Sequence, residues 1–120
     1  MKIHKKGEYS YIDEGAGEPL VLLHGLFGAL SNWEGVVNKF SQEYRVLIPL
    51  LPIYEMPIKQ AGLGALTDFV EGFVEQQSLD QMTLIGNSLG GHVALIYTLR
   101  HPDQIKRLVL TGSSGLFENT

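Results

Sequence analysis

The sequence has 120 residues, of which 44% are hydrophobic and 18% charged, and its formal net charge is −4. These values are ordinary for one globular domain and argue against a disordered chain. Basic residues pair only at Lys5-Lys6 and Lys106-Arg107, which argues against a nucleic-acid partner, because such binding depends on neutralising phosphates. There is no cysteine, so disulfides, a thiol nucleophile and cysteine-based metal sites are excluded.

The start of the chain and the longest apolar segment of the sequence indicate the cellular location of the protein. Residues 1–7 are basic but lack the apolar stretch of a signal peptide. The longest apolar segment, residues 46–53, contains two prolines and is far short of the roughly 20 residues that cross a bilayer. We therefore expect a cytoplasmic protein with no membrane contact.

Hydrophobic patterns predict strands that alternate with helices. Strands are expected at residues 2–6, 8–13, 19–23, 44–50, 82–85 and 106–110. The first two flank Gly7 and should form an antiparallel hairpin. Helices are expected from the cap Ser31 to Phe40, with Trp33, Val36, Val37 and Phe40 in one stripe, then from Leu63 to Gln77 and from Leu89 to Arg100.

Two kinds of residue should interrupt this pattern. Pro49, Pro52 and Pro57 predict a loop before the second helix, because proline lacks a backbone N–H and disfavours helix in the residue before it. Gly72 should weaken that helix by about 1 kcal/mol relative to alanine. His101-Pro102 should end the third helix.

Strands alternating with helices define an α/β fold with a mostly parallel sheet and helices on both faces. Ligands of such sheets bind outside the carboxyl ends of the strands. The loops at residues 24–28, 49–57, 86–91 and 112–115 should therefore share one rim.

The turn Gly86-Asn87-Ser88-Leu89-Gly90-Gly91 follows a predicted strand and opens a predicted helix. Glycines two residues before and after the serine allow close backbone approach, while the serine oxygen is exposed beyond the sheet. The turn predicts Ser88 as a nucleophile. An incidental serine in a tight connection is the alternative.

The loop His24-Gly25-Leu26-Phe27-Gly28 leaves another predicted strand. A glycine-flanked loop can direct a backbone N–H toward the N–H of Leu89, and two such donors form an oxyanion hole. In this interpretation His24 organises the loop and is not a base. A simple turn is the alternative.

The segments HGLFG, GNSLGG and LVLTGSSG, in this order, resemble those of the α/β-hydrolase fold superfamily. The resemblance implies Ser88 as nucleophile, Leu89 as one oxyanion donor through its backbone, and Leu26 or Phe27 as the other. It places His24, Gly25, Asn87, Trp33 and the loop from Pro52 to Pro57 around a pocket for a small-molecule substrate.

Asn87 and Gly90-Gly91 are similar to the corresponding residues of hydrolases that cleave carbon–carbon bonds in ring-fission products, and also of small esterases. The segment Leu50 to Glu55 departs from many relatives, which carry an acid and then G-x-S there, so the pocket border should differ. A serine instead of an aspartate at position 88 argues against a haloalkane dehalogenase or an epoxide hydrolase.

No histidine and acid in the chain are expected to complete a catalytic triad. His92 lies one turn along the helix from Ser88, and the remaining candidates should lie on other elements or at the opposite rim: His4, His101, Asp68, Asp80 and Asp103. The acid and the histidine are expected beyond residue 120.

Residues 1–120 would then be the amino-terminal part of a single α/β-hydrolase domain whose cap and carboxyl-terminal part lie outside the chain. A complementary carboxyl-terminal segment of the same protein is the expected partner, and the chain alone should be nearly inactive. The rival hypothesis is a non-catalytic binding or assembly module. No phosphate-binding loop or metal-ligand spacing is present, so no cofactor and no metal are expected.

Overall fold

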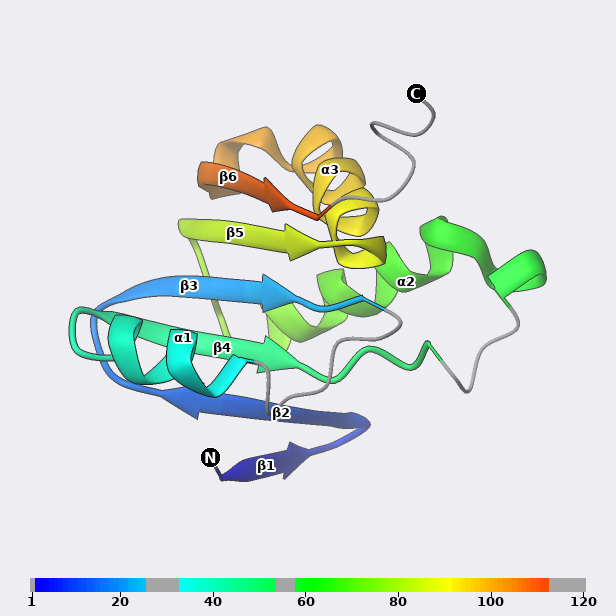
Figure 1. Ribbon diagram of the computed structural model, residues 1–120. Helices are drawn as coiled ribbons and strands as arrows, with labels where there is room; N and C mark the ends of the chain where they lie inside the picture. The colour runs from blue at the N-terminus through cyan, green and yellow to red at the C-terminus, as the bar shows by residue number, and fades with distance from the viewer. Residues whose placement is uncertain (1, 26–32, 54–57, 113–120) are drawn as a thin grey trace.

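The computed structural model describes residues 2–25, 33–53 and 58–112 (Figure 1). These residues form a six-stranded sheet in the order β1-β2-β4-β3-β5-β6. The strands are β1 (Ile3–Lys6), β2 (Tyr9–Glu14), β3 (Glu18–Leu23), β4 (Tyr44–Pro49), β5 (Met82–Asn87) and β6 (Ile105–Thr111). The helices are α1 (Glu34–Phe40), α2 (Ile58–Gln76), α3 (Leu89–Arg100) and the short 3-10 helix η2 (Pro102–Gln104).

The sheet is mostly parallel. The hairpin of β1 and β2 is antiparallel, and so is the pairing of β2 with β4, whereas β4, β3, β5 and β6 run parallel to one another. The predicted α/β class and the predicted succession of strands and helices along the chain are confirmed. The strand bounds differ from the expected ones by one or two residues.

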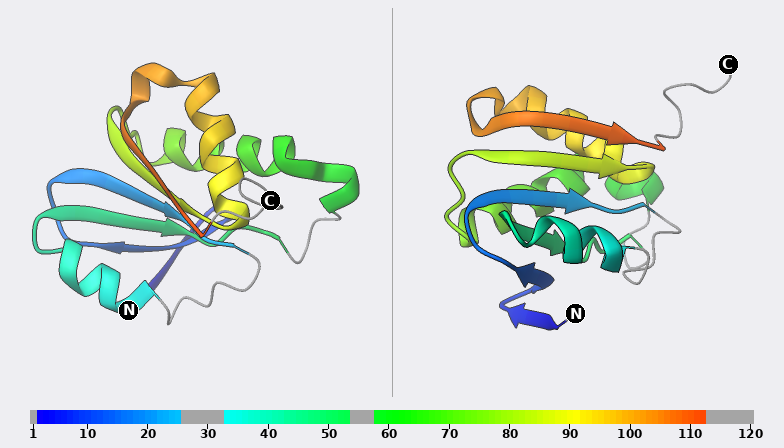
Figure 2. Two further views of the ribbon diagram at one scale, coloured as in Figure 1. Left: turned by 45° about the horizontal axis from the view of Figure 1, so that its top comes forward. Right: turned by 60° about the vertical axis from the view of Figure 1, so that its left-hand side comes forward.

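Helices cover both faces of the sheet, with α1 on one face and α2 and α3 on the other (Figure 2). Successive side chains of a strand point to opposite faces, so β3 contributes to two separate cores. Leu20 and Leu22 pack with Val37 of α1, as expected from the predicted stripe. Val21 and Leu23 pack with α2 and α3.

The start of the second helix differs from the prediction. Helix α2 begins at Ile58, five residues before the expected start at Leu63. Gly62 interrupts it with non-helical backbone angles, φ 63° and ψ −171°. Only glycine adopts such angles readily, so the regular part of α2 does begin at Leu63.

The Tyr9 side chain explains why residue 72, inside helix α2, is a glycine. A Cβ atom at Gly72 would collide with the hydroxyl of Tyr9. The ring of Tyr9 contacts Phe69 and Phe73, which lie on the inward face of α2 as predicted. The loss of helix propensity at Gly72 therefore permits close packing of α2 against β2.

The ends of the other helices agree with the sequence in part. Helix α3 has the predicted bounds and ends before His101. Helix α1 begins at Glu34, and Trp33, at its N-cap position, makes no capping side-chain hydrogen bond. The expected cap, Ser31, lies outside the described residues.

The parallel register brings three strand ends together. Leu23 pairs with Gly86 across β3 and β5, and Asn87 pairs with Thr111 across β5 and β6. The carboxyl ends of β3, β5 and β6 therefore lie at the same end of the sheet (Figure 1). Ligands of α/β sheets bind outside these carboxyl ends of the strands.

Candidate active site

Ser88 is the single residue between strand β5 and helix α3. Its backbone angles are φ 58° and ψ −123°, a region that residues with a side chain rarely adopt. The Ser88 N–H donates to Thr111 O at 3.1 Å, and Ser88 O accepts from the Gly91 N–H at 2.8 Å. The strained residue is therefore held by β6 on one side and by its own helix on the other.

Glycines permit the sharp turn because backbones approach one another around it. A Cβ atom at Gly86 would collide with Gly90 O and with Ala94 Cβ. One at Gly90 would collide with the backbone oxygen atoms of Leu23 and His24. The turn is thus pressed against the end of β3.

Gly25 brings the loop after β3 directly to Ser88. A Cβ atom at Gly25 would lie 2.6 Å from Ser88 Cβ and 3.1 Å from Ser88 Oγ. The Gly25 backbone therefore flanks the serine side chain. The structure brings together the two segments that the sequence singled out, with Gly25 and Ser88 lying 63 positions apart in the chain.

His24 is buried, with 6% of its surface exposed. The Leu51 N–H donates to His24 Nε2 at 2.9 Å, and His24 Nδ1 lies 3.1 Å from Gly25 O. Burial lowers the pKa of His24, and the bond to Gly25 O opposes this less strongly. The imidazole is a connection between backbone segments.

Asn87 and Leu89 flank Ser88. Asn87 Oδ1 accepts from Thr111 Oγ1 at 3.0 Å, which joins the ends of β5 and β6. Leu89 is the first residue of α3 and is partly buried. The N–H groups of a first helical turn have no partner within the helix and attract negative charge.

The other residues expected around a pocket are placed less completely. Leu26 and Phe27, the alternative second oxyanion donors, lie outside the described residues, as does most of the segment from Pro52 to Pro57. Trp33 precedes α1 and packs, partly buried, against the apolar cluster under that helix. Its indole N–H is buried and has no hydrogen-bond partner among the described residues.

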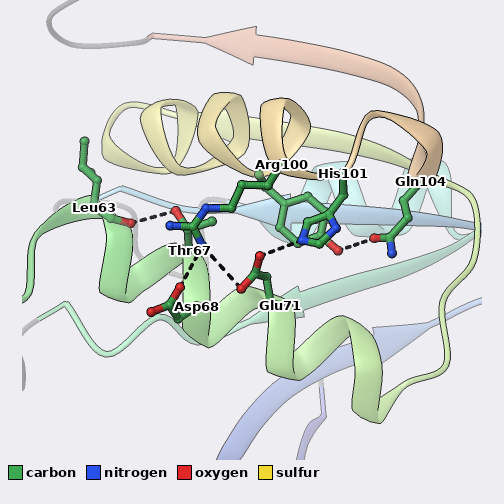
Figure 3. Close-up of polar contacts among 8 residues, drawn as sticks. Leu63, Thr67, Asp68, Glu71, Arg100, His101 and Gln104 are labelled. Carbon is green, nitrogen blue, oxygen red and sulfur yellow. Dashed lines mark hydrogen bonds and ion pairs between the residues drawn. The ribbon is translucent and has the colours of Figure 1, made fainter.

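A second polar cluster lies at the opposite end of α3 (Figure 3). Arg100 contacts Asp68 at 2.7 Å and Glu71 at 3.3 Å, and His101 Nε2 lies 2.6 Å from Glu71 Oε2. The Tyr97 hydroxyl donates to Gln104 Oε1, and burial, with the negative charge of Glu71, raises the pKa of Tyr97 to about 12. The contacts of Arg100 and His101 connect the end of α3 to α2, and the contact of Tyr97 connects α3 to η2.

This second cluster is too far from Ser88 to take part in its chemistry. His101 is 13 positions after Ser88 along the helix, which corresponds to about 20 Å at 1.5 Å per residue. A pocket of about 760 Å³ lined by both His101 and Glu71 opens at that distant end. It therefore does not adjoin the serine.

The remaining candidate acids and bases are also distributed as expected. His4 lies on β1 and stacks on Tyr11. Asp80 precedes β5 and Asp103 lies in η2 before β6, so both are at the amino ends of strands. His92 lies on α3, one turn after Ser88.

Two contacts were missed by the sequence interpretation. These are the bond from Leu51 to His24 and the double contact of Thr111 with Ser88 and Asn87. No sequence pattern predicted them, because both contacts depend on which parallel strands are neighbours in the sheet.

Two further findings concern the described residues only. They contain no helix long and apolar enough to cross a bilayer. They also contain no cluster of histidine and carboxylate side chains suited to hold a metal ion.

Comparison with known proteins gives the family. Residues 18–120 match the family model of the alpha/beta hydrolase fold. The chain is 35% identical over 111 residues to a 2-hydroxymuconate semialdehyde hydrolase of Pseudomonas sp. (strain CF600), covering 87% of this chain and 39% of that protein. It is 34% identical over 116 residues to a 2-hydroxy-6-oxo-2,4-heptadienoate hydrolase of Pseudomonas putida, covering 90% and 42%.

Solved structures agree. An alpha/beta hydrolase enzyme from a sediment metagenome of the Mar Chica lagoon superposes with a TM-score of 0.90 at 42% identity, covering 98% of this chain and 54% of that one. An esterase of a marine microorganism gives a TM-score of 0.72 at 26% identity, covering 86% and 41%. The chain belongs to the alpha/beta hydrolase fold family, and it spans about two fifths of the length of these curated relatives.

Proposed function

We propose that this chain is the amino-terminal part of a serine hydrolase domain, with Ser88 as the nucleophile toward a carbonyl substrate. The observation that carries the proposal is the strained backbone of Ser88 at the junction of β5 and α3, with the Gly25 backbone beside its side chain. Strain of this kind persists where the surrounding structure enforces it, and it is concentrated at active sites.

The proposed mechanism begins with attack of Ser88 Oγ on the substrate carbonyl carbon. The Oγ–C bond forms, the carbonyl electron pair moves to oxygen, and a histidine from beyond residue 120 accepts the Oγ proton. Collapse of this intermediate breaks the ester C–O bond, and the leaving oxygen takes the proton from the histidine to form an alcohol. Water then hydrolyses the acyl-enzyme by the same steps in reverse.

The developing oxyanion would be stabilised by backbone donors. The Leu89 N–H is one, because it belongs to the first turn of α3 and lies next to the nucleophile. The Leu26 or Phe27 N–H would be the other. Loss of one such donor typically costs about 2.7 to 4 kcal/mol of transition-state stabilisation.

A carbon–carbon bond hydrolase is the second candidate. It is favoured by the names of the two Pseudomonas relatives, at 35% and 34% identity. A ring-fission product would then replace the ester as substrate. Comparing kcat/KM of the full-length protein for such dienoates and for short activated esters distinguishes the two candidates.

A serine-directed fluorophosphonate tests the proposed nucleophile. The full-length protein should be labelled on Ser88, and Ser88→Ala should abolish the label. Ser78→Ala is the matched control, because Ser78 also has a positive φ, of 55°, yet lies at the far end of α2. An unlabelled but folded wild-type protein would instead support the non-catalytic module.

A further inference from the structure

His24 connects two loops at the carboxyl ends of the parallel strands, where Ser88 also lies. Its ring lies at the end of β3, and its Nε2 accepts from the backbone N–H of Leu51, which is 27 positions further along the chain. Leu51 follows β4 and is itself buried in the core formed with α2 and α3. The Ile53 N–H donates to Leu51 O at 2.8 Å, and Ile53 is also buried, so the ring is attached to a buried segment.

The two contacts fix the protonation state of the ring. A backbone N–H can only donate, so Nε2 must carry no proton. A carbonyl oxygen can only accept, so Nδ1 must carry the proton toward Gly25 O. The geometry therefore requires a neutral imidazole with the proton on Nδ1, and neither nitrogen is left to act as a general base.

The contact with Gly25 is next to the nucleophile. The Gly25 backbone lies so close to Ser88 that an added Cβ atom would be 3.1 Å from Oγ. A displacement of this backbone would change the space around Oγ directly. A displacement of about 1 Å at a reacting centre can reduce a rate about 100-fold.

We propose that His24 is a positioning residue whose neutral ring, by its bond to Leu51, fixes the place of the Gly25 backbone beside Ser88. This inference rests on the proposed function, since it concerns the geometry around that nucleophile. The bond to Leu51 is the decisive one, because it joins two distant loops. The bond to Gly25 O joins neighbouring residues and constrains them only locally.

Two substitutions separate these bonds in the full-length protein. In His24→Gln, the side-chain oxygen can take the place of Nε2 and accept from the Leu51 N–H. In His24→Asn, the amide nitrogen can take the place of Nδ1 and donate to Gly25 O, but the side chain is too short to reach Leu51. The two variants are thus a matched pair that differs in the bond under test.

We expect His24→Asn to lower kcat about 10- to 100-fold, with KM changed less than about threefold. His24→Gln should keep kcat within about threefold of the wild type. Circular dichroism melts restrict the comparison to folded protein. Equal losses of kcat in both variants, or a wild-type kcat in His24→Asn, would overturn the inference.

Hydrogen exchange separates failure of this inference from failure of the proposed function. The Leu51 amide should exchange at least tenfold faster in His24→Asn than in the wild type, and His24→Gln should retain protection. Equal protection in all three proteins would show that His24 does not connect the loops. Retention of wild-type kcat by Ser88→Ala would refute the proposed nucleophile, and the Leu51 exchange rates would still decide whether the connection exists.

Discussion

Ser78 and Ser88 are the two non-glycine residues with positive φ among those that the structure describes, at 55° and 58°. Ser78 follows the end of α2, where the Ser78 N–H donates to Glu75 O and the Leu79 N–H donates to Val74 O. These two bonds are the usual closure of a helix, in which a left-handed residue is common. Ser78 is exposed, and its φ follows from the end of a helix.

Ser88 has the same sign of φ for a different reason. Its ψ of −123° lies outside the left-handed helical region, and it joins a strand directly to a helix. The backbones of Gly86, Gly90 and Gly25 pack against this turn. Nearly equal φ values therefore do not indicate equal strain, and the more strained serine is the one at the carboxyl ends of the parallel strands.

Alanine substitution of the two serines should give the largest difference in activity between them. We expect Ser88→Ala to lower kcat of the full-length protein by a factor on the order of 10⁶, the usual effect of losing a triad serine. Ser78→Ala should leave kcat within about twofold, since Ser78 lies at the far end of α2. Steady-state kinetics with a short activated ester measures both. A Ser88→Ala enzyme with more than a tenth of the wild-type kcat would rule out the proposed nucleophile.

The close packing around Ser88 is tested by a pair of glycines. Gly90→Ala places a methyl group against the backbone of Leu23 and His24, which cannot yield like a flexible side chain. We expect it to lower the free energy of unfolding by about 3 kcal/mol or more. Gly35→Ala, in α1, meets nothing within 4 Å and should raise it by about 0.5 to 1 kcal/mol. Urea titrations of the full-length variants give both values, and equal effects would contradict the close packing.

The sequence predicted the sheet, its helices and the turn at Ser88 because these depend on local patterns. The period of apolar residues predicts α3, and the glycines on either side of Ser88 indicate close backbone approach. The interruption at Gly62 was not predicted, since the segment before it contains no periodic apolar stripe. The bond between His24 and Leu51 was missed because it depends on which strands are neighbours, and the order β4-β3-β5 is a property of the whole sheet.

Glycine substitution compares the strain at the two serines. Glycine relieves a positive φ, but it also increases the conformational entropy of the unfolded chain, which opposes the gain by about 0.5 to 1 kcal/mol. For Ser78→Gly the two terms should nearly cancel. For Ser88→Gly the larger strain, about 1 to 3 kcal/mol, should leave a net increase in the free energy of unfolding. Guanidinium titrations of both full-length variants check this, and a larger gain at Ser78 would reverse our assignment of strain.

The smallest expected effect is a pH dependence of the unfolding free energy. It concerns the loop beside Ser88, whose contacts require a neutral His24. The pKa of His24 is lowered by burial, so below its ordinary value of about 6.5 the unfolded chain binds more protons than the native protein. The free energy of unfolding must then fall as pH decreases through this range. Glutamine does not titrate, and His4, His92 and His101 are present in both proteins. As pH falls from 7.5 toward the lowered pKa, the unfolding free energy of the wild type should therefore decrease relative to that of His24→Gln. Urea titrations at a series of pH values measure this difference, and a difference independent of pH would show that the ring does not need to be neutral in the folded protein.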